Sequence, residues 1–411
     1  MKRYLVQVAP NKMEDVQRSL SGLGIRPVEK AFDYIIIDIP PEVKPKVETI
    51  PNVVAVVEEK VVGISAVPPK PIPVGKKLKT WIEMLMNPFT AIQAPIFAAL
   101  ETRDRFPTSQ SRMMLGANVA ETMGITGKGV KLAILDTGID DFILQLPPWR
   151  ITVRTSTVEG EPFHIDTNGH GVHTATIAAG SPLWTPWGEI KGVALDAEVG
   201  IFKVLGYTIG AGTTTSVLRG MMDAFEWGAN IISMSLGSDV GPNERHDITA
   251  CPQCRAVKAL TDQGIIFVIA AGNSSEGYAS CPGIAPEAIT VGAVDRNGVI
   301  ADFSSRGHPQ YIELQKPEVV SPGVYILSSA TGLIDLMQAI DGPRLASISG
   351  TSMATPGVSG LITLWYQYAM NKGVKLTTNM VKDIIRTYGK DWDPVYGHGI
   401  PRFEWIVDYL R

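Results

Sequence analysis

Short apolar runs alternate with amphipathic stretches from about Ser111 to the end of the chain. Strands are predicted at Val130–Leu135, Val199–Leu205, Ile231–Leu236, Ile265–Ala270 and Ile289–Val294, and helices at His170–Ala179, Ser216–Trp227 (with Ser216 as its N-cap) and Cys254–Gln263. Strands that are apolar on both faces and alternate with helices are typical of a mostly parallel sheet covered by helices on both faces. We therefore expect an α/β fold for this part of the chain.

Residues 1–64 have the pattern of a small α+β unit. Strands are predicted at Tyr4–Val8, Tyr34–Ile39 and Val53–Val62, and helices at Met13–Leu23 and Glu42–Ile50. With room for one more short strand, this order is close to the β-α-β-β-α-β, ferredoxin-like motif. Three parts are therefore expected: a small domain over 1–66, an extension over 67–110 and a large domain over 111–411.

The extension begins with the Pro-rich, basic run AVPPKPIPVGKK, which is typical of an extended linker. Thr80–Leu100 follows as an amphipathic stretch. It is expected to pack as a helix on the main body, with docking to another surface as the alternative.

Composition and charge exclude several classes of protein. The chain has 411 residues, enough for a large core, and a net charge of −4, which gives no strong basic surface for a nucleic acid. No stretch reaches the ~18 apolar residues of a membrane span. The first residues lack the continuous apolar region of a secretory signal, so we expect a cytoplasmic protein, or an extracellular one if a signal has been removed.

Three residues that follow predicted strands or begin helices carry candidate chemistry. Asp136 directly follows a strand, His170 begins a helix and Ser352 begins another. Each has an ordinary alternative role as a turn former or helix cap, and His170 with His173 could bind a metal, although no third ligand is evident. Together the three residues suggest a catalytic triad, because a serine nucleophile needs an adjacent base and that base needs a buried carboxylate. The order Asp, His, Ser is a known order for such a triad, and the absence of G-x-S-x-G argues against an α/β-hydrolase esterase.

Five motifs, DTGID, GHGVHTA, SMSLGS, AAGN and GTSMATP, occur in the order found in the subtilisin-like serine proteases. The chain resembles that family over about residues 111–402. The resemblance implies that Asp136 orients His170, that His170 is general base and then general acid, and that Ser352 attacks the scissile carbonyl. It also implies an oxyanion hole made by the side chain of Asn273 and the backbone N–H of Ser352.

The same resemblance assigns substrate-binding residues. Two backbone edges would sandwich an extended polypeptide substrate by adding it as a strand, and small residues would line the pocket for the side chain before the scissile bond. These residues are Gly210, Ala211, Gly212, Ser235, Leu236 and Gly237 for the edges, and Gly272 with Ala279–Cys281 for the pocket. The pocket would then have room for a large apolar side chain. The alternative is that these glycines only serve turns.

Residues 1–66 resemble the inhibitory propeptide of the family. The resemblance implies a self-inhibited precursor matured by autoprocessing, with the first cut close to Ser65–Val67 and room for a later cut near Phe106–Pro107. It also places Glu58 and Glu59 at helix N-termini of the catalytic domain. The competing hypothesis is a protease-like scaffold or binding protein that keeps the triad but never matures.

The sequence implies no definite cofactor, and a structural calcium ion is one possibility to weigh. The loop SPLWTPWGEI after the histidine helix lacks the Asn-rich turn that binds calcium in many family members, although calcium could bind elsewhere. An insertion over Asp239–Cys254 contains CPQC. A redox role would need a thioredoxin-like context. A zinc site of Cys251, Cys254, Cys281 and His246 is an alternative, but a disulfide to Cys281 or free buried thiols is favoured.

Overall fold

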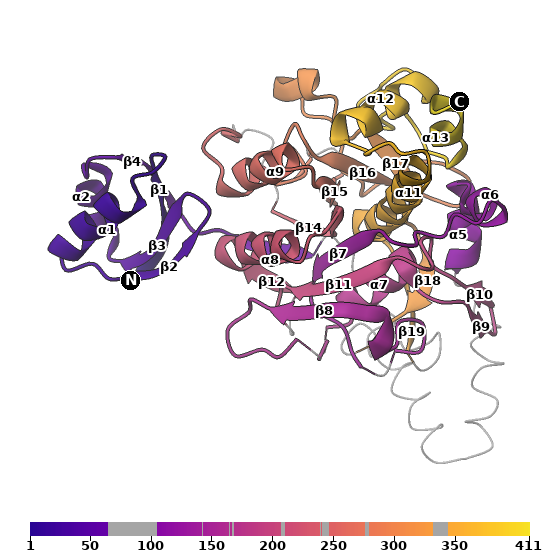
Figure 1. Ribbon diagram of the computed structural model, residues 1–411, viewed down its shortest axis with the longest axis horizontal. Helices are drawn as coiled ribbons and strands as arrows, with labels where there is room; N and C mark the ends of the chain where they lie inside the picture. Colours follow the sequence, from indigo (N-terminus) through magenta and orange to yellow (C-terminus); the bar gives the residue numbers. More distant parts are fainter. Residues whose placement is uncertain are drawn as a thin grey trace, which may run out of the picture.

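The computed structural model describes two bodies joined by an extended strand (Figure 1). The described residues are 1–64, 105–141, 143–163, 165–166, 168–206, 210–238, 240, 246–275, 279–331 and 344–411. The predicted linker and the amphipathic stretch Thr80–Leu100 lie outside them. Within the described ranges, no helix has the length and apolar character needed to cross a membrane.

The N-terminal body is a four-stranded antiparallel sheet with two helices. Its elements are β1 (Lys2–Val8), α1 (Met13–Gly22), β2 (Pro27–Ala31), β3 (Tyr34–Ile39), a 3-10 turn (Pro41–Val43), α2 (Lys44–Glu48) and β4 (Val53–Glu58). The sheet order is β2-β3-β1-β4, with α1 and α2 packed on one face. β3 begins with the apolar run Tyr34–Ile37 because both of its faces are covered: Ile35 and Ile37 pack in this body, whereas Tyr34 and Ile36 pack against the large body.

The large body is built on a seven-stranded parallel sheet. Its strands are β7 (Lys131–Asp136), β8 (Ile151–Ser156), β11 (Glu198–Lys203), β13 (Ile231–Met234), β15 (Ile266–Ala270), β16 (Ile289–Val294) and β17 (Val319–Pro322), in the order β17-β16-β15-β13-β7-β11-β8. Leu132 and Ile134 share a core with α7 (His170–Ala179) and α11 (Thr351–Asn371). Ala133 and Leu135 share another with α8 (Thr214–Glu226) and α9 (Pro252–Asp262). Alternate residues thus bury both faces of the sheet, which confirms the predicted α/β fold.

Shorter elements complete the large body. They are β6 (Phe106–Pro107), α5 (Thr108–Met114), α6 (Ala117–Thr122), β9 (Leu183–Thr185), β10 (Gly188–Ile190), β12 (Ala211–Thr213), β14 (Leu236–Gly237), β18 (Ile326–Ser329), β19 (Leu345–Ile348), α12 (Thr378–Tyr388), α13 (Glu404–Tyr409) and two 3-10 helices (Pro148–Arg150, Pro309–Leu314).

The second predicted cleavage site lies in β6. This strand pairs with β18, Phe106 is buried, and the Phe106 N–H donates to Tyr325 O at 2.7 Å. A protease would have to unpair β6 before cutting, which argues against a cut at Phe106–Pro107.

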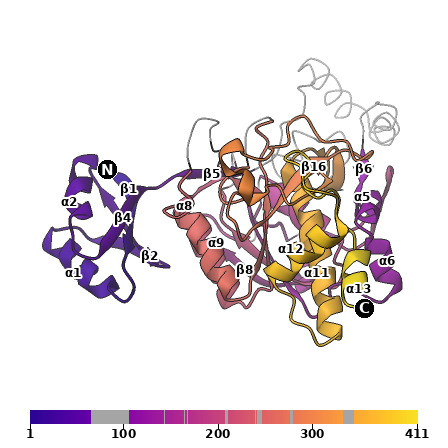
Figure 2. The same cartoon turned by 90° about the horizontal axis from the view of Figure 1, so that it is seen from above.

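One predicted strand is two strands of different sheets. The run Val53–Val62 divides at Glu59-Lys60: β4 ends at Glu58, and β5 (Val61–Ile64) lies between β12 and β14. The prediction of a single strand was wrong because the apolar alternation resumes after the polar pair, whereas the pairing partner changes. Figure 2 shows β5 leaving the N-terminal body and entering the large body near α8.

The predicted N-cap of α8 was also wrong. Thr213 is the N-cap: its side chain accepts from Ser216 N, while Ser216 Oγ accepts from Thr213 N. Ser216 is therefore the other half of a capping box, inside the first turn. The sequence offers both hydroxyls in TTTS, and only the backbone conformation decides between them.

The two bodies meet along α8 and α9. Glu29 pairs with Arg219 of α8, and Asp33 pairs with Arg255 of α9. Glu59 Oε1 accepts from the Thr215 N–H at 3.2 Å, at the N-terminus of α8, where the helix dipole favours a negative charge by about 0.3–1 kcal/mol. Glu58, expected at a helix N-terminus, pairs instead with Lys2 of β1.

Candidate active site

Asp136 and His170 come together at the carboxyl end of β7, an interior strand of the large sheet. His170 Nδ1 donates to Asp136 Oδ1 at 2.7 Å, and both side chains are fully buried. The other carboxylate oxygen accepts from Thr174 Oγ1 at 3.1 Å, and Thr137 N donates to Oδ1 at 2.7 Å. Since a carboxylate only accepts, this arrangement holds the ring proton on Nδ1 and leaves Nε2 as the basic nitrogen.

Ser352 lies in the first turn of α11, and its hydroxyl faces Ser235 in one of the predicted substrate edges. Ser352 Oγ donates to Ser235 O at 2.8 Å, and Ser235 Oγ donates in return to Ser352 O at 2.9 Å. His170 Nε2 has no hydrogen-bond partner in the described part of the chain. The hydrogen bond between serine and histidine is therefore not formed in this state, and forming it requires Ser352 Oγ to leave the Ser235 carbonyl.

Asn273 is fixed by the residue that precedes the serine. Its Oδ1 accepts from the backbone N–H of Thr351 at 3.0 Å and from Thr351 Oγ1 at 3.1 Å. Because a backbone N–H can only donate, the amide oxygen must face Thr351, and the amide nitrogen is turned away from it. Thr351 Oγ1 also accepts from Gly272 N at 3.2 Å, which joins the Asn273 loop to the start of α11.

The two predicted substrate edges are filled by the chain itself. β5 is the middle strand, with Gly63 opposite both Ala211 and Gly237, and both pairings are antiparallel. Ile64 lies opposite Leu236, and its N–H donates to Gly210 O at 3.0 Å. A Cβ on Gly210 would come within 2.8 Å of the Ile64 side chain, so this glycine permits the close approach as well as a turn.

Small residues meet where the specificity pocket was predicted. A Cβ on Gly237 would lie 2.5 Å from Ser280 Oγ, and one on Gly272 would lie 3.2 Å from the same atom. Ser280 Oγ is buried and has no hydrogen-bond partner among the described residues. Gly237, Gly272 and Ser280 therefore form one continuous wall beside the β14 edge.

The alternative in which His170 and His173 bind a metal together does not fit the structure, because the two rings have different partners. His173 is fully buried one turn along α7, where Nε2 faces Ile326 O at 3.1 Å and Ala346 O at 3.0 Å. Burial lowers the pKa of His173 to about 4, so the ring is neutral near pH 7 and Nε2–H donates to these carbonyls. His173 ties α7 to β18 and β19, whereas His170 faces Asp136.

Sequence reasoning missed three residues that hold this geometry. Thr174 contacts Asp136, Thr351 contacts Asn273, and Asp166 accepts from the N–H groups of Gly169 and Val172 at the start of α7. Burial raises the pKa of the Asp166 carboxyl. A signal existed for Thr174, which lies one helical turn after His170 and so on the same face.

This arrangement defines the class: a buried Asp–His pair, a serine at a helix start and a strand-binding cleft together form the site of a serine protease. The model of the subtilase family matches residues 127–399, and the chain belongs to that family. It is 35% identical over 289 residues to Subtilisin Savinase of Lederbergia lenta, covering 70% of this chain and 94% of that protein. It is also 35% identical over 305 residues to Serine protease AprX of Bacillus subtilis, covering 67% and 65% of the two chains.

Proposed function

We propose that the chain is the self-inhibited precursor of an endopeptidase, in which the N-terminal body blocks the cleft until the chain cuts itself. The observation that carries this proposal is β5, which pairs on both sides with the edges predicted to bind substrate. An extended segment held in this way is bound as a peptide substrate or product would be. The N-terminal body adds ion pairs and apolar contacts on α8 and α9.

Each catalytic residue has a distinct role in this proposal. His170 Nε2 takes the proton of Ser352 Oγ as the oxygen attacks the scissile carbonyl carbon, and Asp136 stabilises the imidazolium that forms. The carbonyl oxygen becomes an oxyanion, which accepts from Asn273 Nδ2 and Ser352 N–H. The latter lies in the first turn of α11, where N–H groups lack intrahelical partners. His170 then protonates the leaving amine, and water hydrolyses the acyl-enzyme.

The strand register points to the first bond cut. Ile64 lies opposite Leu236 in an antiparallel pair. Ile64 is the last described residue of this segment, and Ser235, the residue before Leu236, has the carbonyl that accepts from Ser352 Oγ. We therefore infer that the nucleophile cuts a bond just after β5, close to Ser65–Val67.

We expect that the first new N-terminus of the wild-type chain falls between residues 64 and 69, and that separately made 1–66 inhibits the mature protease at micromolar concentration. The inhibition would follow from the β5 pairing and from the Glu59 contact on α8. N-terminal sequencing and an inhibition curve measure the two effects. Because β5 enters the cleft, a matched peptide ending at Glu58 should inhibit far more weakly; equal inhibition by both would contradict the role of β5.

For cleavage in trans, we expect a preference for a large apolar residue before the scissile bond. The wall of Gly237, Gly272 and Ser280 carries no charged side chain. A set of peptides that differ only at this position should show the highest kcat/KM for phenylalanine or leucine. Faster cleavage after lysine or aspartate would contradict this assignment.

Calcium is expected to contribute little to stability. Subtilases commonly bind structural calcium, but the loop after α7 here forms the hairpin β9–β10, with Trp184 opposite Glu189, in place of an Asn-rich turn. A cation stabilises by mass action only where it binds the folded state. Removing and restoring calcium should therefore change the melting temperature of the Ser352→Ala chain only slightly. A large drop that calcium reverses and zinc does not would contradict this expectation.

A further inference from the structure

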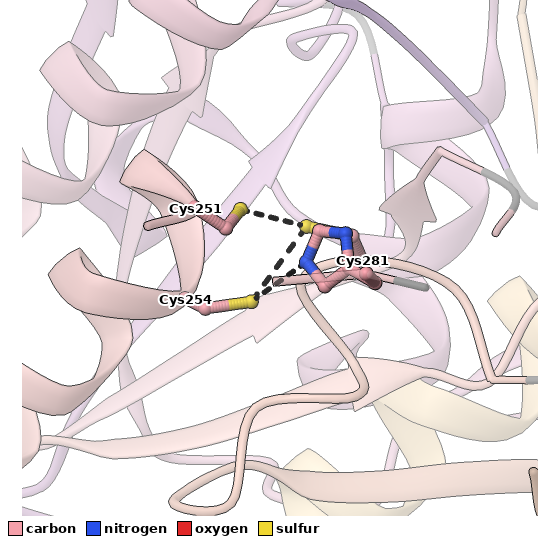
Figure 3. A group of neighbouring side chains, drawn as sticks. Cys251, Cys254 and Cys281 are labelled. Carbon is pink, nitrogen blue, oxygen red and sulfur yellow. Dashed lines mark hydrogen bonds between the residues drawn. The ribbon is translucent and has the colours of Figure 1, made fainter. Parts of the chain in front are cut away.

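Three cysteines and one histidine gather beside the N-terminus of α9, and Figure 3 shows how the three cysteines lie. Cys281 Sγ lies 3.4 Å from Cys251 Sγ and 3.8 Å from Cys254 Sγ, and His246 Nε2 lies 3.4 Å from Cys254 Sγ. All four atoms lie within 4.8 Å of one another. Cys254 and Cys281 are buried and the other two are half-buried, so the group is largely shielded from solvent.

The two favoured sequence-based alternatives are a disulfide to Cys281 and free buried thiols, and neither explains why these four side chains converge. The three cysteines are free thiols in the structure, so the expected disulfide to Cys281 is not formed. A disulfide would also use only two of the three sulfurs and leave the third, with His246, beside it. Free thiols are weak hydrogen-bond donors and acceptors, which gives no reason for three of them to converge with an imidazole.

The distances fit a tetrahedral metal site. With Zn–S bonds of about 2.3 Å, two sulfur ligands of a tetrahedral zinc lie about 3.8 Å apart, and a sulfur and a nitrogen ligand lie slightly closer. Three of the six separations in the cluster, 3.4 to 3.8 Å, are of this size, and all six are within 4.8 Å. Cys₃His is a ligand set of structural zinc, Cys251 and Cys254 have the C-x-x-C spacing of such sites, and soft thiolates disfavour calcium and magnesium.

The backbone around the cluster is organised by its own hydrogen bonds. Asp247 Oδ1 accepts from the N–H groups of Thr249 and Ala250, and Cys251 N donates to Asp247 O at 2.9 Å. Cys251 is the N-cap of α9, and Cys254 lies in its first turn. Thiolates are favoured there, because the helix dipole and the unpaired N–H groups of the first turn stabilise negative charge.

We propose that His246 Nε2 and the sulfurs of Cys251, Cys254 and Cys281 bind one zinc ion in a closed, structural site. The three thiols would lose their protons on binding, and four protein ligands leave no open position for catalysis. The site joins the 246–254 segment to the substrate cleft: Cys281 N donates to Ser238 O at 3.0 Å, and Ser238 N donates to Cys281 O at 2.9 Å. Ser238 directly follows the β14 edge.

The test uses the full-length Ser352→Ala chain, which cannot cut itself, so its outcome is independent of the proposed protease activity. Elemental analysis of the purified protein should find about one zinc per chain. Exchange with cobalt should give the visible absorption of a tetrahedral thiolate site, a readout that needs no further variant. A folded chain without zinc, with two of its thiols lost as a disulfide, would overturn the proposal, and one equivalent of iron would overturn the assignment to zinc.

Two histidine variants test the ligand set. His246→Gln in the same background should lower zinc retention against a chelator at least tenfold. His398→Gln should not, because His398 Nδ1 donates to Lys390 O far from the cluster in the chain. Equal loss of zinc in both variants, or full retention in the Cys254→Ser variant, would contradict the assignment.

Discussion

Replacing Ser352 by alanine is expected to lower kcat for peptide hydrolysis by about 10⁶-fold, a magnitude borrowed from a related protease of the same family. The variant lacks the oxygen that attacks the carbonyl, so the residual rate comes from substrate binding and the oxyanion hole alone. The chain should also remain at full length, because it has no nucleophile for its own cleavage. Kinetics on a chromogenic peptide and the mass of the purified chain measure both effects.

Ser359 offers a matched control on the same helix. It is equally buried, and its hydroxyl bonds Ser233 Oγ and Thr355 O in the interior. Ser359→Ala should keep kcat within a few-fold of wild type and should still lose its N-terminal body. Wild-type kinetics in the Ser352→Ala chain would instead contradict the triad.

Replacing Asn273 by alanine is expected to lower kcat by about 10²–10³-fold with little change in KM, a range that also comes from a protease of this family. The loss falls on kcat because Nδ2 donates to charge that exists only in the transition state. Single-substrate kinetics over a range of peptide concentrations separate the two constants.

Aspartate at the same position sharpens this test. Asn273→Asp keeps an acceptor for the Thr351 N–H but removes the Nδ2 donor. The kcat of this variant should therefore fall at least as far as that of the alanine variant, because a carboxylate repels the oxyanion. Near wild-type kcat in the aspartate variant would show that Asn273 only positions Thr351.

The strands of the large sheet could be predicted closely because burial on both faces leaves an apolar run. β16 has the predicted bounds, and β7 differs by one residue at each end. The error over Val53–Val62 has a different origin. Local alternation cannot show that β4 pairs with β1 while β5 pairs with β12 and β14, since that choice depends on tertiary contacts.

Motif order identified Asp136 and His170, which the fold brings into contact. It could not give the hydrogen bond from Ser352 to Ser235, because a side-chain rotamer depends on its surroundings in three dimensions. The cysteine cluster could not be predicted from the sequence for the same reason. Cys254 and Cys281 are 27 positions apart, and only the packing of α9 against the loop after β15 brings their sulfurs together.

The most direct test of the central claim is labelling of the purified protein with a serine-directed phosphonyl reagent during hydrolysis of a chromogenic peptide. The account predicts that one label attaches to Ser352, in step with the loss of hydrolysis, and that the full-length Ser352→Ala chain takes up none. Hydrolysis that persists after complete labelling of Ser352, or a wild-type chain that neither matures, cleaves peptide nor takes up label, would contradict it and favour a scaffold that keeps the triad without using it.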